Sequence, residues 1–220
     1  MLVSLWSAKG GAGVSVTAAL LALRAGRRDP QGVLLVDIGG DQPLVLGAPP
    51  GPAAGLTDWL ADQRRSPAGL AASAIEVAPG LDLLLRGRRR WASADSVDDA
   101  VGVLSEHPAT VIVDAGNLTG DDPAAAVGLR FAAASTRSIL VTRPCYLALA
   151  RARDAPLMPS AIVLLREPDR ALTAVDVEAA IGAPVVASID VDPSVARAVD
   201  AGLLAGRSPR GLDRALDAVA

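Results

Sequence analysis

The sequence predicts a single α/β domain over residues 1–220, in which helices cover both faces of a mostly parallel sheet of about seven strands. Three observations support this three-layer α/β/α arrangement. Short apolar runs alternate with helical patterns, which is typical of βα units around a parallel sheet. Runs such as residues 33–37 are continuously apolar, as expected for strands that are covered on both faces. No Ser/Gly-rich linker, composition shift or internal repeat interrupts this order.

Each predicted strand is followed by at least one predicted helix. The strands are short runs rich in Val, Ile and Leu, which favour a buried sheet. They cover residues 2–6, 33–37, 81–85, 110–114, 138–142, 161–165 and 184–189. The helices are stretches, many of them rich in Ala and Leu, in which apolar residues recur with helical spacing. They cover residues 14–26, 56–62, 68–74, 93–105, 124–134, 146–154, 173–181, 193–202 and 211–219.

The composition excludes several classes of protein. A hydrophobic content of 51% with 20% charged residues excludes intrinsic disorder. The net charge of −3 argues against binding of polyanions over the whole surface, although a local patch is compatible with it. Every basic residue except Lys9 is arginine. We attribute the excess of Arg, Ala, Gly and Pro to a coding bias.

The reactive residue types are scarce. The single cysteine, Cys145, excludes an internal disulfide, and with the single histidine, His107, it excludes a Cys/His zinc site. His107 lies in a loop before a strand, where a surface role is favoured over catalysis. The sequence contains neither a secretory signal nor an apolar run of about 18 residues, so we expect a cytoplasmic protein. The short, acidic C-terminal segment lacks the apolar face of a membrane anchor, and membrane binding is not expected.

The most informative segment is Ser7-Ala8-Lys9-Gly10-Gly11-Ala12-Gly13-Val14-Ser15, between the first strand and the first helix. Glycines here allow consecutive backbone N–H groups to curl around an anion at the helix N-terminus, where the helix dipole also favours negative charge. Ser15 is placed to offer its hydroxyl to Mg²⁺. The alternative is that Ser15 only satisfies free backbone N–H groups of the helix. The segment predicts a phosphate-binding loop.

The order Lys9-Gly10-Gly11-Ala12-Gly13-Val14-Ser15 resembles the deviant Walker A motif, KGGxGK[ST], of the ParA/MinD family of P-loop ATPases. Four further segments resemble this family in the same order: its second strand (33–37), its Walker B strand (110–114), its final strand and nucleotide-base loop (182–192), and the helix after that loop (195–202). The resemblance covers nearly the whole chain and is closest to the branch of septum-site proteins and CpaE/TadZ localisation factors of pilus assembly. It implies a P-loop, Rossmann-like fold, binding of ATP or ADP with Mg²⁺, and a homodimer or a dimer with an intact relative.

The resemblance also implies roles for individual residues. Lys9 matches the lysine that reaches across the dimer interface to the partner's phosphates. Ser15, Asp37 and Asp114 match positions close to the Mg²⁺ ion, although each aspartate could instead cap the turn after its strand. The residues expected to contact a nucleotide are Lys9, Gly10, Gly11, Ala12, Gly13, Val14, Ser15 and Asp192.

Three positions depart from the family pattern, and each has a separate role. Val14 replaces the second lysine of the motif, which grips the β and γ phosphates. Gly39 replaces the second aspartate of a D-x-D sequence, which helps to position the attacking water, and Asp41 is a candidate stand-in. The segment Leu164-Leu165-Arg166 has an apolar residue where an asparagine reads the adenine edge. We therefore predict that ATP hydrolysis is absent or negligible.

The densest charge cluster is Arg86-Gly87-Arg88-Arg89-Arg90-Trp91. A charge run of this kind is usually a solvated face. The alternative is an anion site, because arginine forks suit phosphates and an indole can stack on a base, and several ParA-like proteins bind DNA through arginines. The negative net charge and the confinement to one loop favour the solvated face.

These observations lead to one main hypothesis and two alternatives. The main hypothesis is a degenerate ParA/MinD-like protein that lacks catalysis and serves pilus, septum or secretion machinery as a dimeric scaffold or positioning factor. Its loop still offers the backbone N–H groups of Gly10, Gly11 and Gly13 to an anion. One alternative is a working ATPase in which Asp41 and an arginine compensate for the missing groups. The other is a nucleic-acid or small-nucleotide binding module that uses the loop 86–91.

Overall fold

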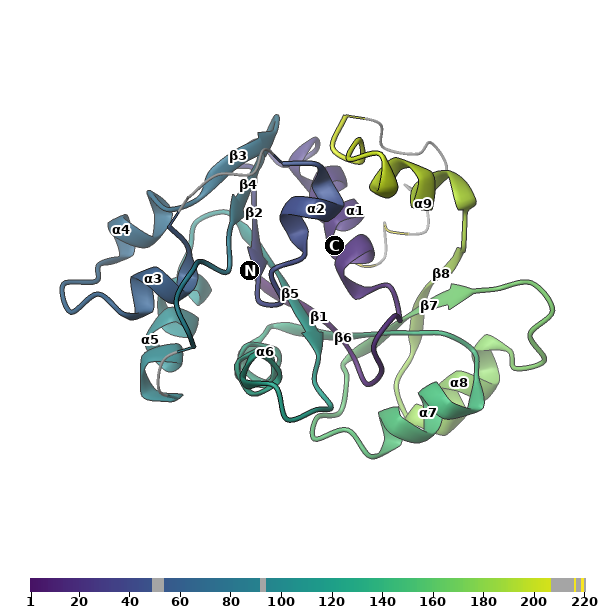
Figure 1. Cartoon of the computed structure of the whole chain (residues 1–220). Coiled ribbons are helices and arrows are strands. Elements are labelled where there is room, and N and C mark those ends of the chain that lie inside the picture. The colour runs from purple at the N-terminus through teal and green to yellow at the C-terminus, as the bar shows by residue number, and fades with distance from the viewer. Residues whose placement is uncertain (49–53, 92–93, 207–215, 217–218, 220) are drawn as a thin grey trace.

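The computed structural model shows an α/β fold built on one 8-stranded, mostly parallel sheet (Figure 1). It describes residues 1–48, 54–91, 94–206, 216 and 219. The strands lie in the order β3-β4-β2-β5-β1-β6-β7-β8, and within these residues each neighbouring pair is parallel except β3 and β4. The predicted fold class is confirmed.

The elements have the following bounds. The strands are β1 Leu2–Ser7, β2 Val33–Asp37, β3 Ile75–Ala78, β4 Leu81–Leu84, β5 Thr110–Asn117, β6 Arg137–Thr142, β7 Ala161–Arg166 and β8 Val185–Asp190. The helices are α1 Val14–Gly26, α2 Gln42–Leu46, α3 Leu56–Leu60, α4 Pro67–Ala71, α5 Ala94–Ser105, α6 Pro123–Ala134, α7 Tyr146–Arg153, α8 Ala174–Ile181 and α9 Pro193–Asp200. The predicted helix 211–219 lies largely outside the described residues.

Two short elements were missed by the sequence patterns. β3 is an antiparallel edge strand that pairs with β4 through a tight turn, in which Gly80 has a φ of 73°. It begins at Ile75, so the helix expected at 68–74 ends earlier, at Ala71. α2 has only 5 residues and ends at Gly47, which adopts the left-handed conformation. Elements this short contain too few residues to show a helical or strand period.

The side chains of alternate strand residues pack on opposite faces of the sheet. Leu2 and Trp6 of β1 belong to the apolar core beneath α3, α4, α5, α6, α7 and α8. Val3 and Leu5 of the same strand belong to the core beneath α1 and α2, with α9 packed at its border. Figure 1 shows these helices on either side of the sheet. No helix in the described ranges is long and apolar enough to cross a membrane.

The strand order reverses at β1, which lies between β5 and β6. From β1 the chain crosses to β2 on one side of the sheet, and β6, β7 and β8 later extend the other side. Ligands of open α/β sheets bind beyond the carboxyl ends of the strands at such a reversal point. The loop between β1 and α1 lies at this edge, and so do the ends of the neighbouring parallel strands β5 and β6.

Candidate functional site

The glycine-rich loop has the backbone conformation that an anion site requires. Gly11 and Gly13 have φ values of 72° and 95°, in the left-handed region that favours glycine. A Cβ atom on Gly10 or Gly11 would have no neighbour within 4 Å, so the loop lies open to a ligand. At its end, the backbone N–H and the hydroxyl of Thr17 donate to the Gly13 carbonyl at 2.9 and 2.8 Å. The residues present therefore fit a phosphate group in front of α1.

Val14 does not face this opening as a phosphate ligand would. Its side chain is 6% exposed and belongs to the apolar core beneath α1. Lys9, by contrast, is partly exposed in the loop. The loop thus combines an open backbone cradle with an apolar residue at the first position of α1, and it lacks a lysine at that position.

Asp37 and Asp114 end up side by side because β2 and β5 pair in register. Both carboxylates are buried, with exposed fractions of 0% and 1%. One oxygen of Asp37 accepts from the Gly40 N–H at 2.7 Å and the other from the Gln42 N–H at 3.1 Å. The Ser15 side chain hydrogen-bonds Asp114. The structure therefore brings together the three residues expected near Mg²⁺.

Gln42 is a component of this cluster that the sequence patterns did not single out. Its side-chain amide donates to the Asp114 carboxylate at 2.8 Å and to the Ser15 carbonyl at 2.9 Å. Its own carbonyl oxygen is buried without a hydrogen-bond partner among the described residues. The buried amide of Gln42 therefore links α1 to β5, and its carbonyl oxygen remains available as a hydrogen-bond acceptor.

The two buried carboxylates strongly resist simultaneous ionisation. Burial, together with the neighbouring charges of Asp114 and Asp41, raises the pKa of Asp37 to about 7. Burial likewise raises the pKa of Asp114, although hydrogen bonds from Ser15 and Gln42 oppose this effect. A divalent cation would compensate both negative charges. Within the described part of the chain, no group of three or more His, Cys, Asp or Glu residues is arranged to hold a metal ion, so a metal here would depend on Ser15 and water as further ligands.

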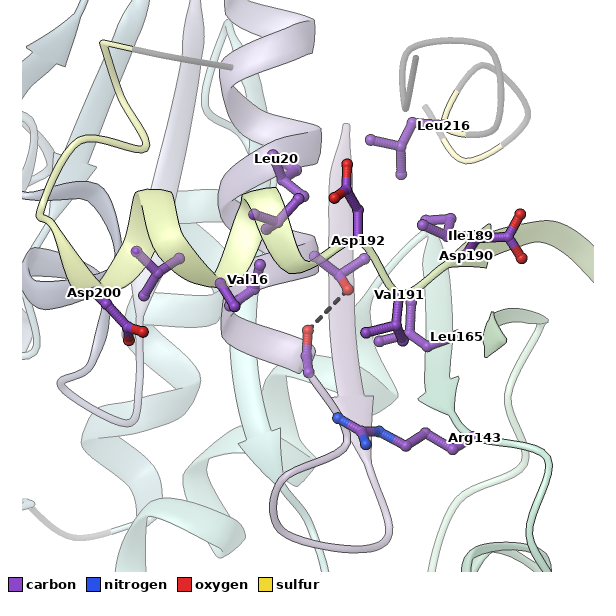
Figure 2. A pocket seen from close by; sticks show the side chains of 15 residues that line it. Val16, Leu20, Arg143, Leu165, Ile189, Asp190, Val191, Asp192, Asp200 and Leu216 are labelled. Carbon is purple, nitrogen blue, oxygen red and sulfur yellow. Dashed lines mark hydrogen bonds between the residues drawn. The ribbon is translucent and has the colours of Figure 1, made fainter. Parts of the chain in front are cut away.

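A cavity of about 290 Å³ opens beside the start of α1, between β7, β8 and α9 (Figure 2). Its wall is mainly apolar and includes Leu20, Leu165 and Val195. A Cβ atom on Gly13 would lie 2.6 Å from Leu165 Cδ1, so this leucine packs directly on the phosphate loop. Asp192 lies at the cavity as well, where its carboxylate caps α9 by accepting from the Ser194 N–H at 2.7 Å. The cavity wall offers apolar contact to a flat ring such as a nucleobase. Leu165 has no side-chain amide to hydrogen-bond the edge of that ring.

Arg143 is the cation that the structure places beside the phosphate loop and that the sequence patterns did not single out. It follows β6, the strand next to β1, and it lines the large cavity together with Gly13. It also lines a small cavity of about 20 Å³ together with Lys9 and Cys145. In Figure 2 its guanidinium points toward the loop that precedes α1. Only the sheet order, which puts β6 against β1, reveals this proximity.

The arginine loop lies at the same edge of the sheet, beyond β2. The guanidinium of Arg86 lies 5.7 Å from the centre of the Trp91 ring and donates to the Gly39 carbonyl at 3.1 Å. Arg89 forms an ion pair with Asp58 at 3.7 Å. Arg88 and Arg90 are exposed. A polar cavity of about 380 Å³ separates this loop from the turn after Asp37. The structure therefore brings the arginine loop next to the Asp37 turn and leaves it away from Lys9.

The remaining candidates lie in different places. Asp41 is exposed, and it is close enough to raise the pKa of Asp37. His107 precedes β5 and therefore lies at the amino end of that strand, whereas the phosphate loop follows the carboxyl end of β1. His107 is thus separated from the cluster around Asp114 by the length of the strand.

The fold and the loop geometry define an α/β protein whose first strand–helix turn is an open, glycine-rich loop that fits a phosphate group. No protein-family model and no curated protein matches the sequence. Among solved structures, the chain is similar to the septum site-determining protein MinD of Pyrococcus horikoshii in complex with Mg-ADP, with 21% identity over 99% of this chain and 93% of that chain and a TM-score of 0.79. It is similar to a ParA family ATPase of Chlorobium tepidum, with 22% identity, coverages of 98% and 97%, and a TM-score of 0.76. A MinC:MinD cell division protein complex of Aquifex aeolicus matches at 16% identity, with coverages of 98% and 93% and a TM-score of 0.75. The chain therefore has the fold of ParA/MinD-type nucleotide-switch proteins.

Proposed function

We propose that the chain, as a single ParA/MinD-like domain, is a nucleotide-responsive scaffold or positioning factor that has lost most or all ATP hydrolysis. The observation that carries this proposal is the state of the phosphate loop. Gly11 and Gly13 keep the conformation of an anion cradle, while Val14 is buried in the apolar core. The loop can therefore bind a nucleotide through its backbone without the lysine that grips the transferred phosphate.

Each part of a nucleotide has a place in this site. The backbone N–H groups of Gly10, Gly11 and Gly13 would hold the phosphates, and Ser15, Asp37 and Asp114 would hold Mg²⁺ directly or through water. The cavity beside Leu165, with Asp192 at its border, would take the base. Mg²⁺ supplies charge compensation for the phosphates when it is bound. The charge of Mg²⁺ would in turn favour the ionised forms of both buried carboxylates.

The same geometry argues against efficient hydrolysis. Gly39 carries no side chain, and its carbonyl is already engaged by Arg86 at 3.1 Å. Asp41, the candidate stand-in, is exposed at the N-terminus of α2, and its charge helps to raise the pKa of Asp114, but among the described residues it forms no hydrogen bond with Ser15 or Asp114. Neither Gly39 nor Asp41 thus holds an attacking water in a fixed position. An active ATPase would require Asp41 to move toward the loop.

Self-association through Lys9 is the expected output of nucleotide binding. Lys9 is partly exposed in an open loop, so its ammonium can reach a second copy of the chain or an intact relative. The MinC:MinD complex indicates that a protein of this fold assembles with a further protein. A pilus, septum or secretion component is the kind of protein partner that we propose for the present chain.

Lys9→Ala tests this function. The wild type should shift from monomer to dimer in sedimentation experiments when Mg-ATP is added, and Lys9→Ala should remain monomeric because it lacks the cation that reaches the partner's phosphates. Arg28→Ala, which removes a positive charge just beyond the opposite end of α1, is the matched control and should dimerise. Steady phosphate release by the wild type would contradict the loss of hydrolysis. Dimerisation of Lys9→Ala would refute the role of Lys9.

The arginine loop supports a second candidate, the binding of nucleic acid or a small anionic nucleotide. The cavity of about 380 Å³ lined by Arg86, Arg88 and Arg89 is the observation that favours it. This candidate predicts a DNA mobility shift that weakens steeply with salt, and the log–log slope should become shallower by about one for each arginine–phosphate pair that a substitution removes. The triple variant Arg88/Arg89/Arg90→Ala should abolish the shift. A DNA shift that the triple variant retains, or no shift by the wild type, would rule out nucleic-acid binding by this loop.

A further inference from the structure

Arg143 is positioned by the sheet to act on the phosphate loop. β6 pairs with β1 in parallel register, with Leu140 opposite Trp6, so the chain that leaves β6 emerges beside the chain that leaves β1. Arg143 is the first residue after β6. It lines one cavity together with Gly13 and another together with Lys9, on either side of the loop. Its side chain therefore borders the space in front of α1.

The hydrogen bonding of Arg143 leaves part of its guanidinium available. One terminal nitrogen of Arg143 forms an ion pair with Glu167, and the same carboxylate receives two hydrogen bonds from Arg170. These two arginines and one carboxylate carry a net charge of +1. The Nε atom of Arg143 is buried and has no hydrogen-bond partner among the described residues. The guanidinium thus has donors to spare for a further acceptor.

The ion pair with Glu167 does not prevent Arg143 from turning to an anion. Arg170 lowers the pKa of Glu167 by hydrogen bonding, and the charge of Arg143 adds to this effect. If Arg143 moves to an anion in the loop, Arg170 still holds the partly exposed carboxylate of Glu167, so this carboxylate keeps an ion-pair partner. Arg170 lines neither of the two cavities, and it can remain in place during this exchange.

We infer that Arg143, from the strand next to the phosphate loop, supplies the phosphate-binding cation that Val14 does not. This inference rests on the proposed function, since it requires that the loop binds the phosphates of a nucleotide. A guanidinium presents several N–H donors in a planar fork and binds two phosphate oxygens at once. The guanidinium of Arg143 would approach a bound phosphate from β6, at the side of the loop. A lysine at position 14 would approach it from the first residue of α1. The site thereby regains one positive charge.

Calorimetry with two probes, inorganic tripolyphosphate and Mg-ADP, tests this inference. Arg143→Gln should weaken the binding of both probes by about 10- to 100-fold, because it removes a charge-assisted hydrogen bond to phosphate. Arg143→Lys should lie between Arg143→Gln and the wild type. Glu167→Gln, which removes the competing carboxylate, should bind at least as tightly as the wild type. Arg130→Gln, which breaks an exposed ion pair with Asp98 on another helix, is the matched control and should bind as the wild type does.

The outcomes separate the inference from the proposed function. If the wild type binds both probes and Arg143→Gln binds them equally well, the inference is wrong and the proposed nucleotide binding stands. If the wild type binds neither probe, both fail together, because the loop then holds no phosphate. Thermal unfolding without ligand shows whether Arg143→Gln folds. If it does not fold, Arg143→Lys and Glu167→Gln decide the question through their affinities for tripolyphosphate.

Discussion

Restoring a lysine at position 14 is expected to raise the affinity for Mg-ADP by about 10- to 100-fold, because the ammonium would add a charge-assisted contact to the phosphates. Val14 is the first residue of α1, and the long stem of a lysine can leave the apolar core there and reach the loop. The substitution also removes a side chain that is only 6% exposed. We therefore expect Val14→Lys to lower the free energy of unfolding by about 1 to 2 kcal/mol.

The matched control for this prediction is Val14→Met, which adds length at the same position without a charge. It should share the loss of stability and show no gain in affinity. Calorimetry with Mg-ADP gives the affinities, and urea unfolding gives the stabilities. Equal affinities for Val14→Lys and Val14→Met would show that the nucleotide pocket does not use a cation at this position. Since Arg143 borders the same loop, a combined Val14→Lys/Arg143→Gln variant would show whether one cation replaces the other.

The nucleotide-free and Mg²⁺-free protein is expected to lose stability as the pH rises from about 4 to about 7. Burial and the nearby charges of Asp114 and Asp41 raise the pKa of Asp37 from 3.8 to about 7. The folded state therefore binds the proton of Asp37 more tightly than the unfolded chain does. The contribution of Asp37 to the free energy of unfolding is fully present below about pH 4, and it decreases as the pH rises to about 7. A shift of this size corresponds to about 4 kcal/mol, of which about 3 kcal/mol falls between about pH 5 and pH 8.

Asp37→Asn should flatten this dependence, because the amide does not ionise. Urea unfolding in EDTA at about pH 5 and about pH 8 measures this effect. Asp82→Asn, at an exposed position of β4, is the control. An unchanged slope in Asp37→Asn would exclude Asp37 as the origin. A smaller slope should remain in that variant, because burial raises the pKa of Asp114 as well.

Much of the site could be predicted because its chemistry is local in the sequence. The glycines of the loop, the strand before it and the helix after it occupy consecutive residues, and the observed α1 begins and ends at the predicted residues 14 and 26. The apolar runs that end at Asp37 and Asp114 identified two buried strands, and buried parallel strands read as continuous apolar segments. The absence of a lysine at position 14 was equally visible. These features depend on neighbours in the chain, and the sequence specifies those directly.

Gln42 and Arg143 could not be predicted in the same way. Gln42 belongs to a helix of 5 residues that has no recognisable period, and nothing in its surroundings marks it as buried. Arg143 is one arginine in a chain that uses arginine for every basic position except Lys9. The edge strand β3 was missed because none of its 4 residues is fully buried and they do not form a long apolar run. Gln42 and Arg143 acquire their roles from segments that are distant in the sequence.

The sequence by itself determined the α/β fold class, the position of the glycine-rich loop between the first strand and the first helix, and the presence of Val14 rather than a lysine at the start of that helix. Only the tertiary structure decided which side chains meet that loop. The pairing of β2 with β5 places Asp37 opposite Asp114, and the pairing of β1 with β6 brings Arg143 beside Gly13. The physical reason is that the hydrogen-bonding register between strands joins residues whose separation along the chain gives no local signal.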